Sequence, residues 1–310
     1  MSVDRGIAPR TGTTAARRAI ARKYARETAK AGGTWSALIT VTDPDGAEHP
    51  VVEDHPDRVV EAYSVNKVAV AVAVLDKVDR GLLRLDQRVE VTHDVVIRDT
   101  DGIFALDGAY PSSVTLGHAL AALLTVSDNT AVRLCGLVVP ALELNDVLAA
   151  KGFTHTRVEP VDHPNRFYLG TTTPRETATL FARLARGDLL SPASTAHLLT
   201  VLRSLTSFTE GVRRDLTSPE RLDVATKAGW YDDGRNEAGL VFDARGVPVL
   251  TFALFASGAF RGDQARNFED YGATHPALRA RAALGRSCYD AVRGTAAAPR
   301  TAPGTDRPEN

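Results

Sequence analysis

The chain has few of the features that mark a membrane, nucleic-acid-binding or zinc-binding protein. It has 37 basic and 38 acidic residues, so its net charge of −1 is no electrostatic footprint for nucleic acid. No stretch approaches the roughly 18 to 20 apolar residues that a membrane-spanning helix needs. Only two cysteines are present, Cys135 and Cys288, which allow at most one disulfide and lack the paired spacing of a zinc site.

We expect no secretory signal in the N-terminal region of this sequence. Residues 17–23 (RRAIARK) interrupt any apolar core with basic side chains. Residues 1–25 are rich in arginine and poor in acidic side chains, which also suits an organellar transit peptide. An amphipathic helix over 12–31, closed by Gly32-Gly33, is the favoured interpretation, and we expect a cytoplasmic protein. Cys135, on an apolar helical stretch, is expected to be a small buried side chain, which suits a reducing compartment.

Hydrophobic patterns divide the chain into strands at both ends and helices in the middle. The expected strands cover 35–42 and 48–52, joined by the turn 43–46, and then 239–243 and 247–256. The expected helices cover 64–81, 116–126, 128–139, 144–151, 174–186, 192–205 and 275–292. The composition of residues 295–310 is that of a disordered tail.

This order predicts an α/β (α+β) fold with two lobes. Residues 1–60 and 211–293 would build an antiparallel sheet flanked by helices, and residues 61–210 an all-helical lobe, followed by the tail 294–310. A cleft between the lobes is the expected place for a ligand.

Ser64 and Lys67 lie three residues apart where a long apolar helical run begins. On a helix, this spacing brings both side chains to one face, within hydrogen-bonding reach. A serine hydroxyl is a weak nucleophile until a base takes its proton, and a lysine serves as that base only when it is neutral. Burial and nearby cations lower a lysine pKa, so the pair fits nucleophilic catalysis. Alone, this spacing arises readily by chance and decides nothing.

Ser127-Asp128-Asn129 precedes another apolar helical run. The Ser127 hydroxyl can relay a proton to a leaving group, and the Asn129 amide can bind a substrate carbonyl or orient Lys67. Serine, aspartate and asparagine are also preferred helix N-caps, so this triplet taken alone favours capping.

Lys227-Ala228-Gly229 leads into two apolar, strand-like runs. Lys227 would bring a cation to an edge strand, and Gly229 would let the backbone approach a substrate closely. The N–H groups of Trp230 and Ser64 are candidates for an oxyanion hole, in which one donor is typically worth about 2.7–4 kcal/mol. An ordinary strand start is the alternative interpretation.

Taken together, the three motifs resemble those of the serine β-lactamase and penicillin-binding-protein superfamily, whose signature is Ser-x-x-Lys, Ser-Asp-Asn and Lys-Thr-Gly. The resemblance is strongest to class A β-lactamases and covers most of residues 12–293. Thr171-Thr172-Thr173-Pro174 resembles the exit of that family's active-site Ω-loop. The roles implied by the resemblance are nucleophile (Ser64), its partner (Lys67), proton relay (Ser127), substrate contact (Asn129) and electrostatic anchor (Lys227).

The expected Ω-loop departs from the family's pattern, in which a glutamate within Glu-Pro-x-Leu-Asn activates the deacylating water. One alignment of residues 156–166 makes Glu159 that glutamate. The other makes Glu159 structural and puts Asp162 in its place, and it is preferred because it keeps the usual spacing from Ser127 more closely. The loop is short and lacks Leu-Asn, and an aspartate is one methylene shorter than a glutamate. A displacement near 1 Å can cost about 100-fold in rate, so we expect impaired deacylation but normal acylation.

The sequence therefore predicts a serine hydrolase, without metal or cofactor, that opens β-lactam rings through an acyl-enzyme on Ser64. The first alternative is a cytoplasmic biosynthetic esterase, amidase or acyltransferase on the same fold. Ala228 favours it, because the family uses a hydroxyl there to bind the β-lactam carboxylate. The second alternative is a slowly acylating binding or sensor domain. Trp230 would either stack on an apolar acyl group or pack on the surface, and Phe104 is a candidate for the cleft wall. The expected partner is a small-molecule β-lactam, ester or amide, and the chain is expected to be a monomer.

Overall fold

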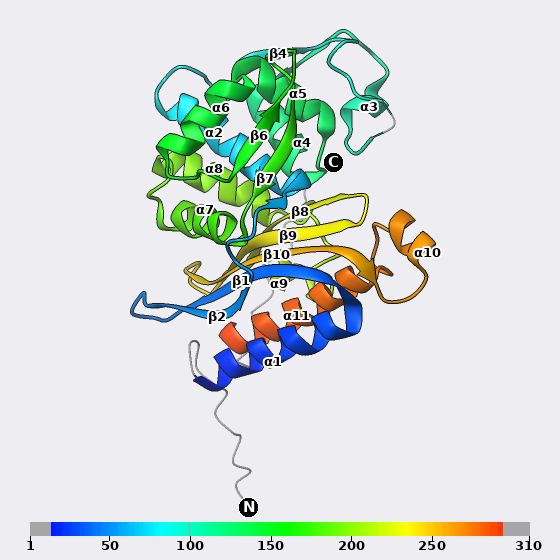
Figure 1. The fold of residues 1–310 in the computed structure, drawn as a ribbon. Helices are drawn as coiled ribbons and strands as arrows, with labels where there is room; N and C mark the ends of the chain where they lie inside the picture. Colours follow the sequence, from blue (N-terminus) through cyan, green and yellow to red (C-terminus); the bar gives the residue numbers. More distant parts are fainter. Residues whose placement is uncertain (1–13, 99, 294–310) are drawn as a thin grey trace, which may run out of the picture.

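The computed structural model describes residues 14–98 and 100–293 (Figure 1). Its central layer is a five-stranded sheet in the order β2-β1-β10-β9-β8, with antiparallel pairing throughout. The strands are β1 (Gly32–Thr42), β2 (Glu48–Asp54), β8 (Val224–Tyr231), β9 (Gly234–Phe242) and β10 (Pro248–Phe260). Since β1 pairs with β10, the two ends of the described chain meet in one sheet.

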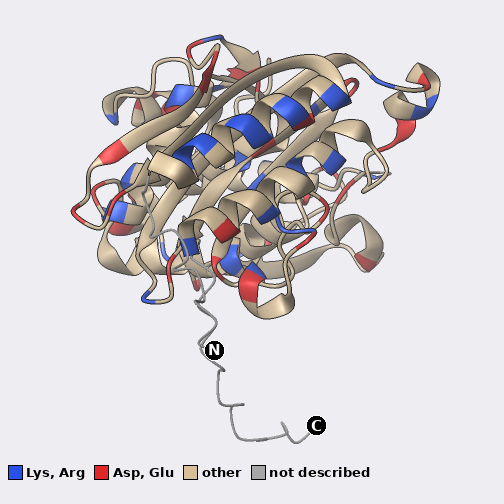
Figure 2. Cartoon of the chain, turned by 90° about the horizontal axis from the view of Figure 1, so that it is seen from below, with Lys and Arg blue, Asp and Glu red and all other residues tan. Residues whose placement is uncertain are grey.

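Two long helices cover the face of this sheet that is turned away from the helical lobe (Figure 1). They are α1 (Thr14–Ala31) and α11 (Pro276–Arg293), which lie side by side. α1 buries Ile20 and Tyr24 and exposes Arg18, Arg22 and Arg26. Figure 2, which looks onto this layer, shows positions of lysine and arginine (blue) spaced along its helices. The predicted amphipathic helix is therefore present, although its residues 12–13 lie outside the described part of the chain.

The second lobe is mainly helical and is built around α2 (Lys67–Asp79). Every residue from Lys67 to Leu75 is buried, because neighbouring elements surround this apolar helix. The other long helices of the lobe are α4 (Leu116–Thr125), α5 (Asn129–Val138), α6 (Ala141–Ala150), α7 (Pro174–Arg186) and α8 (Pro192–Arg203). In Figure 1, α7 lies between this lobe and the sheet.

The predicted fold class is confirmed, but the helical lobe also contains two small sheets that were not predicted. One has the order β3-β7-β6, with β3 (Val60–Glu61), β6 (Arg157–Pro160) and β7 (Phe167–Thr172). The other pairs β4 (Arg88–Val91) with β5 (Ser112–Thr115). Short helices complete the described chain: η1 (Tyr63–Asn66), α3 (Phe104–Asp107), α9 (Ser218–Arg221) and α10 (Gln264–Glu269).

The two cysteines and the lengths of the helices bear on smaller expectations from the sequence. Cys135 and Cys288 are both buried and both reduced. None of the helices in the described ranges is long and apolar enough to cross a membrane. The expected tail, 295–310, lies outside the described residues.

Candidate active site

Ser64 lies on η1, and Lys67 begins α2 directly after it. Ser64 borders a cavity of about 1290 Å³, whereas the Lys67 side chain is fully buried. Tyr63, just before Ser64, has a φ of 47°, a left-handed conformation that non-glycine residues seldom adopt. Its ring lies over Gly234, where an added Cβ would come within 2.2 Å of a ring carbon. Such strained residues gather at functional sites, where the surrounding structure holds them in place.

The Lys67 ammonium group is held by three oxygen atoms of the second motif. Its Nζ donates to the Ser127 carbonyl at 2.5 Å, to Ser127 Oγ at 3.0 Å and to Asn129 Oδ1 at 2.7 Å. Among the described residues, no hydrogen bond joins Lys67 to the Ser64 hydroxyl. The Asn129 amide nitrogen donates to Thr100 Oγ1 at 2.6 Å, so Asn129 is fixed from both ends of its side chain.

A second buried lysine reaches the same hydroxyl from the opposite lobe. Lys227 lies on β8, the edge strand of the main sheet, and is 2% exposed. Its Nζ donates to Ser127 Oγ at 3.0 Å and to the Ala228 carbonyl at 2.7 Å. Ser127 has a φ of 55°, which is again left-handed. Two lysines, one from each lobe, therefore converge on a single serine hydroxyl.

Burial determines the protonation of this pair. It lowers the pKa of Lys67 to about 7, although the carboxylates of Asp101 and Asp128 act in the opposite direction. Burial also lowers the pKa of Lys227 well below its ordinary value, and the positive charge of Lys67 lowers it further. A lysine with a pKa near neutrality can both accept and return a proton at physiological pH.

Asp128, the middle residue of the second motif, has a structural role. Its Oδ1 accepts the Ala131 N–H at 2.9 Å and caps α5, as the capping interpretation predicts. Its Oδ2 accepts the N–H groups of Ile103 and Phe104 at 2.7 and 2.9 Å. The triplet therefore combines a cap with two side chains aimed at Lys67. Phe104 itself is 4% exposed and belongs to the core, so it does not form the cleft wall that the sequence suggested.

Gly229 brings β8 into direct contact with η1. A Cβ added there would lie 2.7 Å from the main-chain nitrogens of both Ser64 and Val65, closer than real Cβ contacts. Only glycine fits this position without displacing the strand. The sequence suggested a close approach to a substrate, whereas the close approach in the structure is to the main chain of η1. The neighbouring Trp230 packs between Phe208 and Tyr271, with ring centroids 5.4 and 6.5 Å away, and also borders the cavity.

The two candidate carboxylates of the expected Ω-loop lie on the β6–β7 hairpin. Glu159 is on β6, exposed, and borders the same cavity as Ser64. Asp162 is exposed in the turn between the strands and is not part of the cavity wall. Among the described residues, neither carboxylate hydrogen-bonds to Ser64 or Lys67.

Asn66 ties this hairpin to η1, the helical turn that carries Ser64, a contact that was not predicted. The side chain is 2% exposed, and its Nδ2 donates to the carbonyls of Leu169 at 2.7 Å and Thr171 at 2.9 Å. The available sequence signal was a single amide inside an apolar run, since a buried polar group needs a partner.

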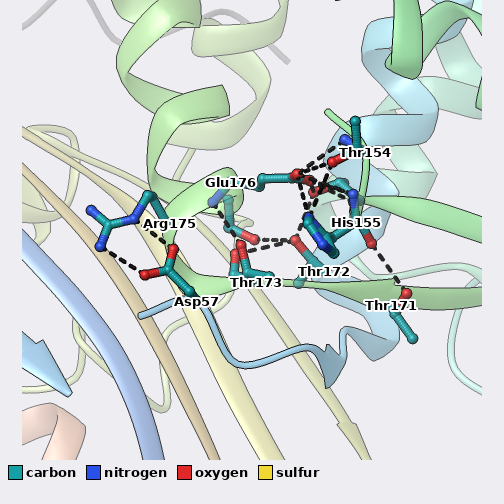
Figure 3. Close-up of polar contacts among 10 residues, drawn as sticks. Asp57, Thr154, His155, Thr171, Thr172, Thr173, Arg175 and Glu176 are labelled. Carbon is teal, nitrogen blue, oxygen red and sulfur yellow. Dashed lines mark hydrogen bonds and ion pairs between the residues drawn. The ribbon is translucent and has the colours of Figure 1, made fainter. Parts of the chain in front are cut away.

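The Thr171–Pro174 segment fixes the other end of the hairpin (Figure 3). Thr173 Oγ1 accepts the Glu176 N–H at 3.0 Å and caps α7. The Glu176 carboxylate accepts the N–H groups of residues 154–156 at 2.6 to 3.0 Å. Arg175 pairs with Asp57 at 2.6 Å. Thr173 therefore anchors the start of α7, and Glu176, in the first turn of that helix, anchors the entry to β6.

Comparison with known proteins places this arrangement in a family. The sequence profile described as "Beta-lactamase enzyme family" matches residues 18–292. The chain belongs to this family. A β-lactamase of Streptomyces albus G is 26% identical over 216 residues, which are 64% of this chain and 66% of that protein. The match thus spans just under two thirds of that β-lactamase's length.

Solved structures share the fold of this β-lactamase family member at low sequence identity. A β-lactamase from Sphaerobacter thermophilus DSM 20745 aligns with a TM-score of 0.70 at 22% identity, over 88% of this chain and 96% of its own. A mutant of PBP-A, solved as an acyl-enzyme complex with penicillin-G, aligns with a TM-score of 0.68 at 22% identity, over 91% and 98% of the two chains. At this identity the solved structures show a shared fold.

Proposed function

We propose that this hydrolase opens β-lactam rings through an acyl-enzyme on Ser64. The observation that carries the proposal is the convergence of Lys67 and Lys227 on Ser127 Oγ, each at 3.0 Å, beside a serine that borders a large cavity. Proton transfer needs a base near neutrality and a relay of donors and acceptors, and Lys67 and Ser127 supply these. Ser64 Oγ has no hydrogen bond to either in the described residues, so the proposal requires that contact to form when the substrate binds. The substrate is a small molecule, and the chain acts as a monomer without metal or cofactor.

In the proposed acylation, neutral Lys67 removes the hydroxyl proton of Ser64 as Oγ bonds to the substrate carbonyl carbon. The proton passes through Ser127 to the lactam nitrogen as the carbon–nitrogen bond breaks. Asn129 contacts the substrate. Lys227 attracts the substrate carboxylate, which in turn favours the protonated form of that lysine.

The developing oxyanion is proposed to bind the N–H groups of Ser64 and Trp230. The contact of Gly229 with the main chain of η1 supports this assignment, because it brings the strand that carries Trp230 against the nucleophile. The indole of Trp230, which borders the cavity, is proposed to stack on an apolar part of the acyl group.

Deacylation is the slower half of the proposed cycle. A general base must reach the attacking water, and neither Glu159 nor Asp162 hydrogen-bonds within the described lysine–serine cluster. Spacing along the chain favours Asp162 as the base, whereas the position of Glu159 on the cavity wall favours Glu159. Because neither carboxylate contacts the cluster, the base that activates the water is poorly placed, and we expect a long-lived acyl-enzyme.

The test is intact-protein mass spectrometry after seconds and after hours with a chromogenic cephalosporin. Wild type, Ser64→Ala and a control, Ser112→Ala on β5, are compared. We expect an adduct of the mass of the whole cephalosporin, or of the cephalosporin less its leaving group, in wild type and in the control but not in Ser64→Ala. An adduct that persists in Ser64→Ala would overturn the assigned nucleophile.

The same experiment separates the alternatives. An adduct that clears while product accumulates would identify a β-lactamase. An adduct that stays for hours and is discharged by an added amine or alcohol would identify an acyltransferase. An adduct that resists both water and the added acceptor would identify a sensor. Absence of any adduct, with hydrolysis of short acyl esters, would assign the site to an esterase.

A further inference from the structure

Two arginines border the Ser64 cavity on the side of α5 and the β6–β7 turn. Arg133 lies on α5, and Arg166 lies just before β7. Both are half-buried, and they meet at one main-chain oxygen. Arg166 Nη2 donates to the Asp94 carbonyl at 2.9 Å, and Arg133 Nη1 donates to the same oxygen at 3.3 Å. The shared acceptor holds two like charges close together.

The packing of the turn against α5 keeps the pair in place. A Cβ added at Gly136 would lie 2.1 Å from the Asn165 carbonyl oxygen, so the turn rests directly on the helix one turn after Arg133. Arg133 is further fixed by its hydrogen bond to the Val95 carbonyl at 3.3 Å. The two guanidinium groups are therefore positioned by backbone contacts rather than by a flexible side-chain partner.

No carboxylate among the described residues neutralises this pair. Neither arginine forms an ion pair in the described chain, although Glu61, Asp101 and Glu159 border the same cavity. Desolvation lowers the pKa of Arg133, and the charge of Arg166 lowers it further, as expected for neighbouring cations without a counter-ion. Each guanidinium also keeps N–H groups that make no bond within the described residues. Such planar forks match the geometry of a carboxylate.

The cavity connects this pair to the nucleophile. Ser64 and Asn129 lie on its wall, and so do both arginines. At about 1290 Å³ the cavity exceeds the 300–1,000 Å³ that is usual for small-ligand sites, so it has room for an acyl group with a long substituent.

We infer that the acyl group transferred to Ser64 ends in a carboxylate, which Arg133 and Arg166 bind. This inference rests on the proposed acyl-enzyme function and specifies the substrate class for the same site. The carboxylate bound here belongs to the acyl portion and is distinct from the one attracted by Lys227.

The test uses two cephalosporins that differ only at the 7-amino acyl group, glutaryl in one and neutral pentanoyl in the other. The second-order rate constant for acylation of Ser64 is measured by quenched-flow mass spectrometry. Hydrogen bonds to charged groups correspond to about 10- to 100-fold in rate, so we expect the glutaryl compound to react faster by that factor in wild type. In Arg133→Gln/Arg166→Gln this preference should fall to within about twofold of unity.

The matched control is Arg18→Gln/Arg22→Gln on α1, which removes two exposed positive charges from the far layer of the molecule. It should retain the full preference. If the Gln variant does not fold, Arg133→Lys/Arg166→Lys replaces it. This variant keeps both charges but loses the planar guanidinium groups, so it should retain only part of the preference for the glutaryl compound. Equal rates for the two compounds in wild type, or a preference unchanged in the Gln variant, would overturn the inference. Neither result would contradict the proposed acyl-enzyme function.

Binding separates this inference from the proposed function. In Ser64→Ala, calorimetry should find tighter binding of the glutaryl compound than of the pentanoyl compound, again by about 10- to 100-fold. Failure of both compounds to acylate wild type would refute the proposed function, whereas this binding preference would still decide the substrate class. Equal binding of the two compounds would exclude it.

Discussion

The pH dependence of acylation tests whether Lys67 is the base. Its pKa is lowered to about 7, so the neutral, proton-accepting form is present as a sizeable fraction at physiological pH. Because the pKa is lowered, the neutral fraction rises through pH 7 and then saturates. We therefore expect the second-order acylation constant to increase about tenfold between pH 6 and pH 8 and to reach a plateau above pH 8.

An unperturbed lysine would give a different profile. With the ordinary pKa of 10.5, the neutral fraction grows about tenfold for each pH unit, hence about 100-fold between pH 6 and pH 8, without a plateau before pH 10. The assay follows formation of the acyl-enzyme from a chromogenic cephalosporin in stopped flow, from pH 5.5 to pH 9.5. A log-linear rise through pH 9 would refute the assignment of Lys67 as the base.

Two variants identify the titrating residue, because Lys227 also has a lowered pKa. Lys67→Arg carries a cation that does not deprotonate, and we expect it to acylate about 10²- to 10⁴-fold more slowly than wild type on the plateau above pH 8, without an inflection near pH 7. Lys227→Arg makes the neighbouring charge permanent, so the inflection should remain and move to lower pH. Disappearance of the inflection in Lys227→Arg would assign the titration to Lys227 instead.

Three further predictions concern the frame of the site. Gly229→Ala would force β8 away from Ser64, and acylation should fall by about 100-fold or more while the thermal unfolding transition remains cooperative. Single-turnover kinetics should find that Asp162→Asn slows deacylation more than Glu159→Gln, and the opposite order would make Glu159 the base. Glu176→Gln should lower the free energy of unfolding at pH 7 by about 1–3 kcal/mol in urea titrations. Burial raises the pKa of Glu176, but hydrogen bonds from His155 and Thr156 outweigh it and leave the pKa below the ordinary 4.5, so this difference should persist above pH 4.5 and disappear as the pH falls further.

The parts of the site that follow local rules were predictable from the sequence. The spacing of Ser64 and Lys67, the capping side chain of Asp128 and the need for Gly229 on an edge strand each involve residues close in the chain or a single backbone requirement. The fold class was predictable for a similar reason, because the hydrophobic periodicity of a helix or a strand can be recognised within a short segment of sequence.

The remaining parts depend on contacts between distant segments. The β6–β7 hairpin was expected as an Ω-loop, and its strands are held by the amides of Asn66 and of Asn145, whose side chain bonds both main-chain polar groups of Val158 at 2.9 Å. The arginine pair likewise becomes visible only when the turn at Asn165 rests on α5. No pattern within either segment specifies such a neighbour.

The pairing of β1 with β10 has a consequence for synthesis of the chain. Strand β1 is made early, but its main hydrogen-bonding partner, β10, is the last strand of the described chain to be translated. Until then β1 presents an unpaired edge, a template for association with other chains. The elements that carry Ser64, Lys67 and Ser127 precede β8 along the chain, so Lys227 is the last of these four residues to be translated. Since β8 reaches β1 only through β9 and β10, we expect the four-residue cluster to be complete only after the sheet has formed.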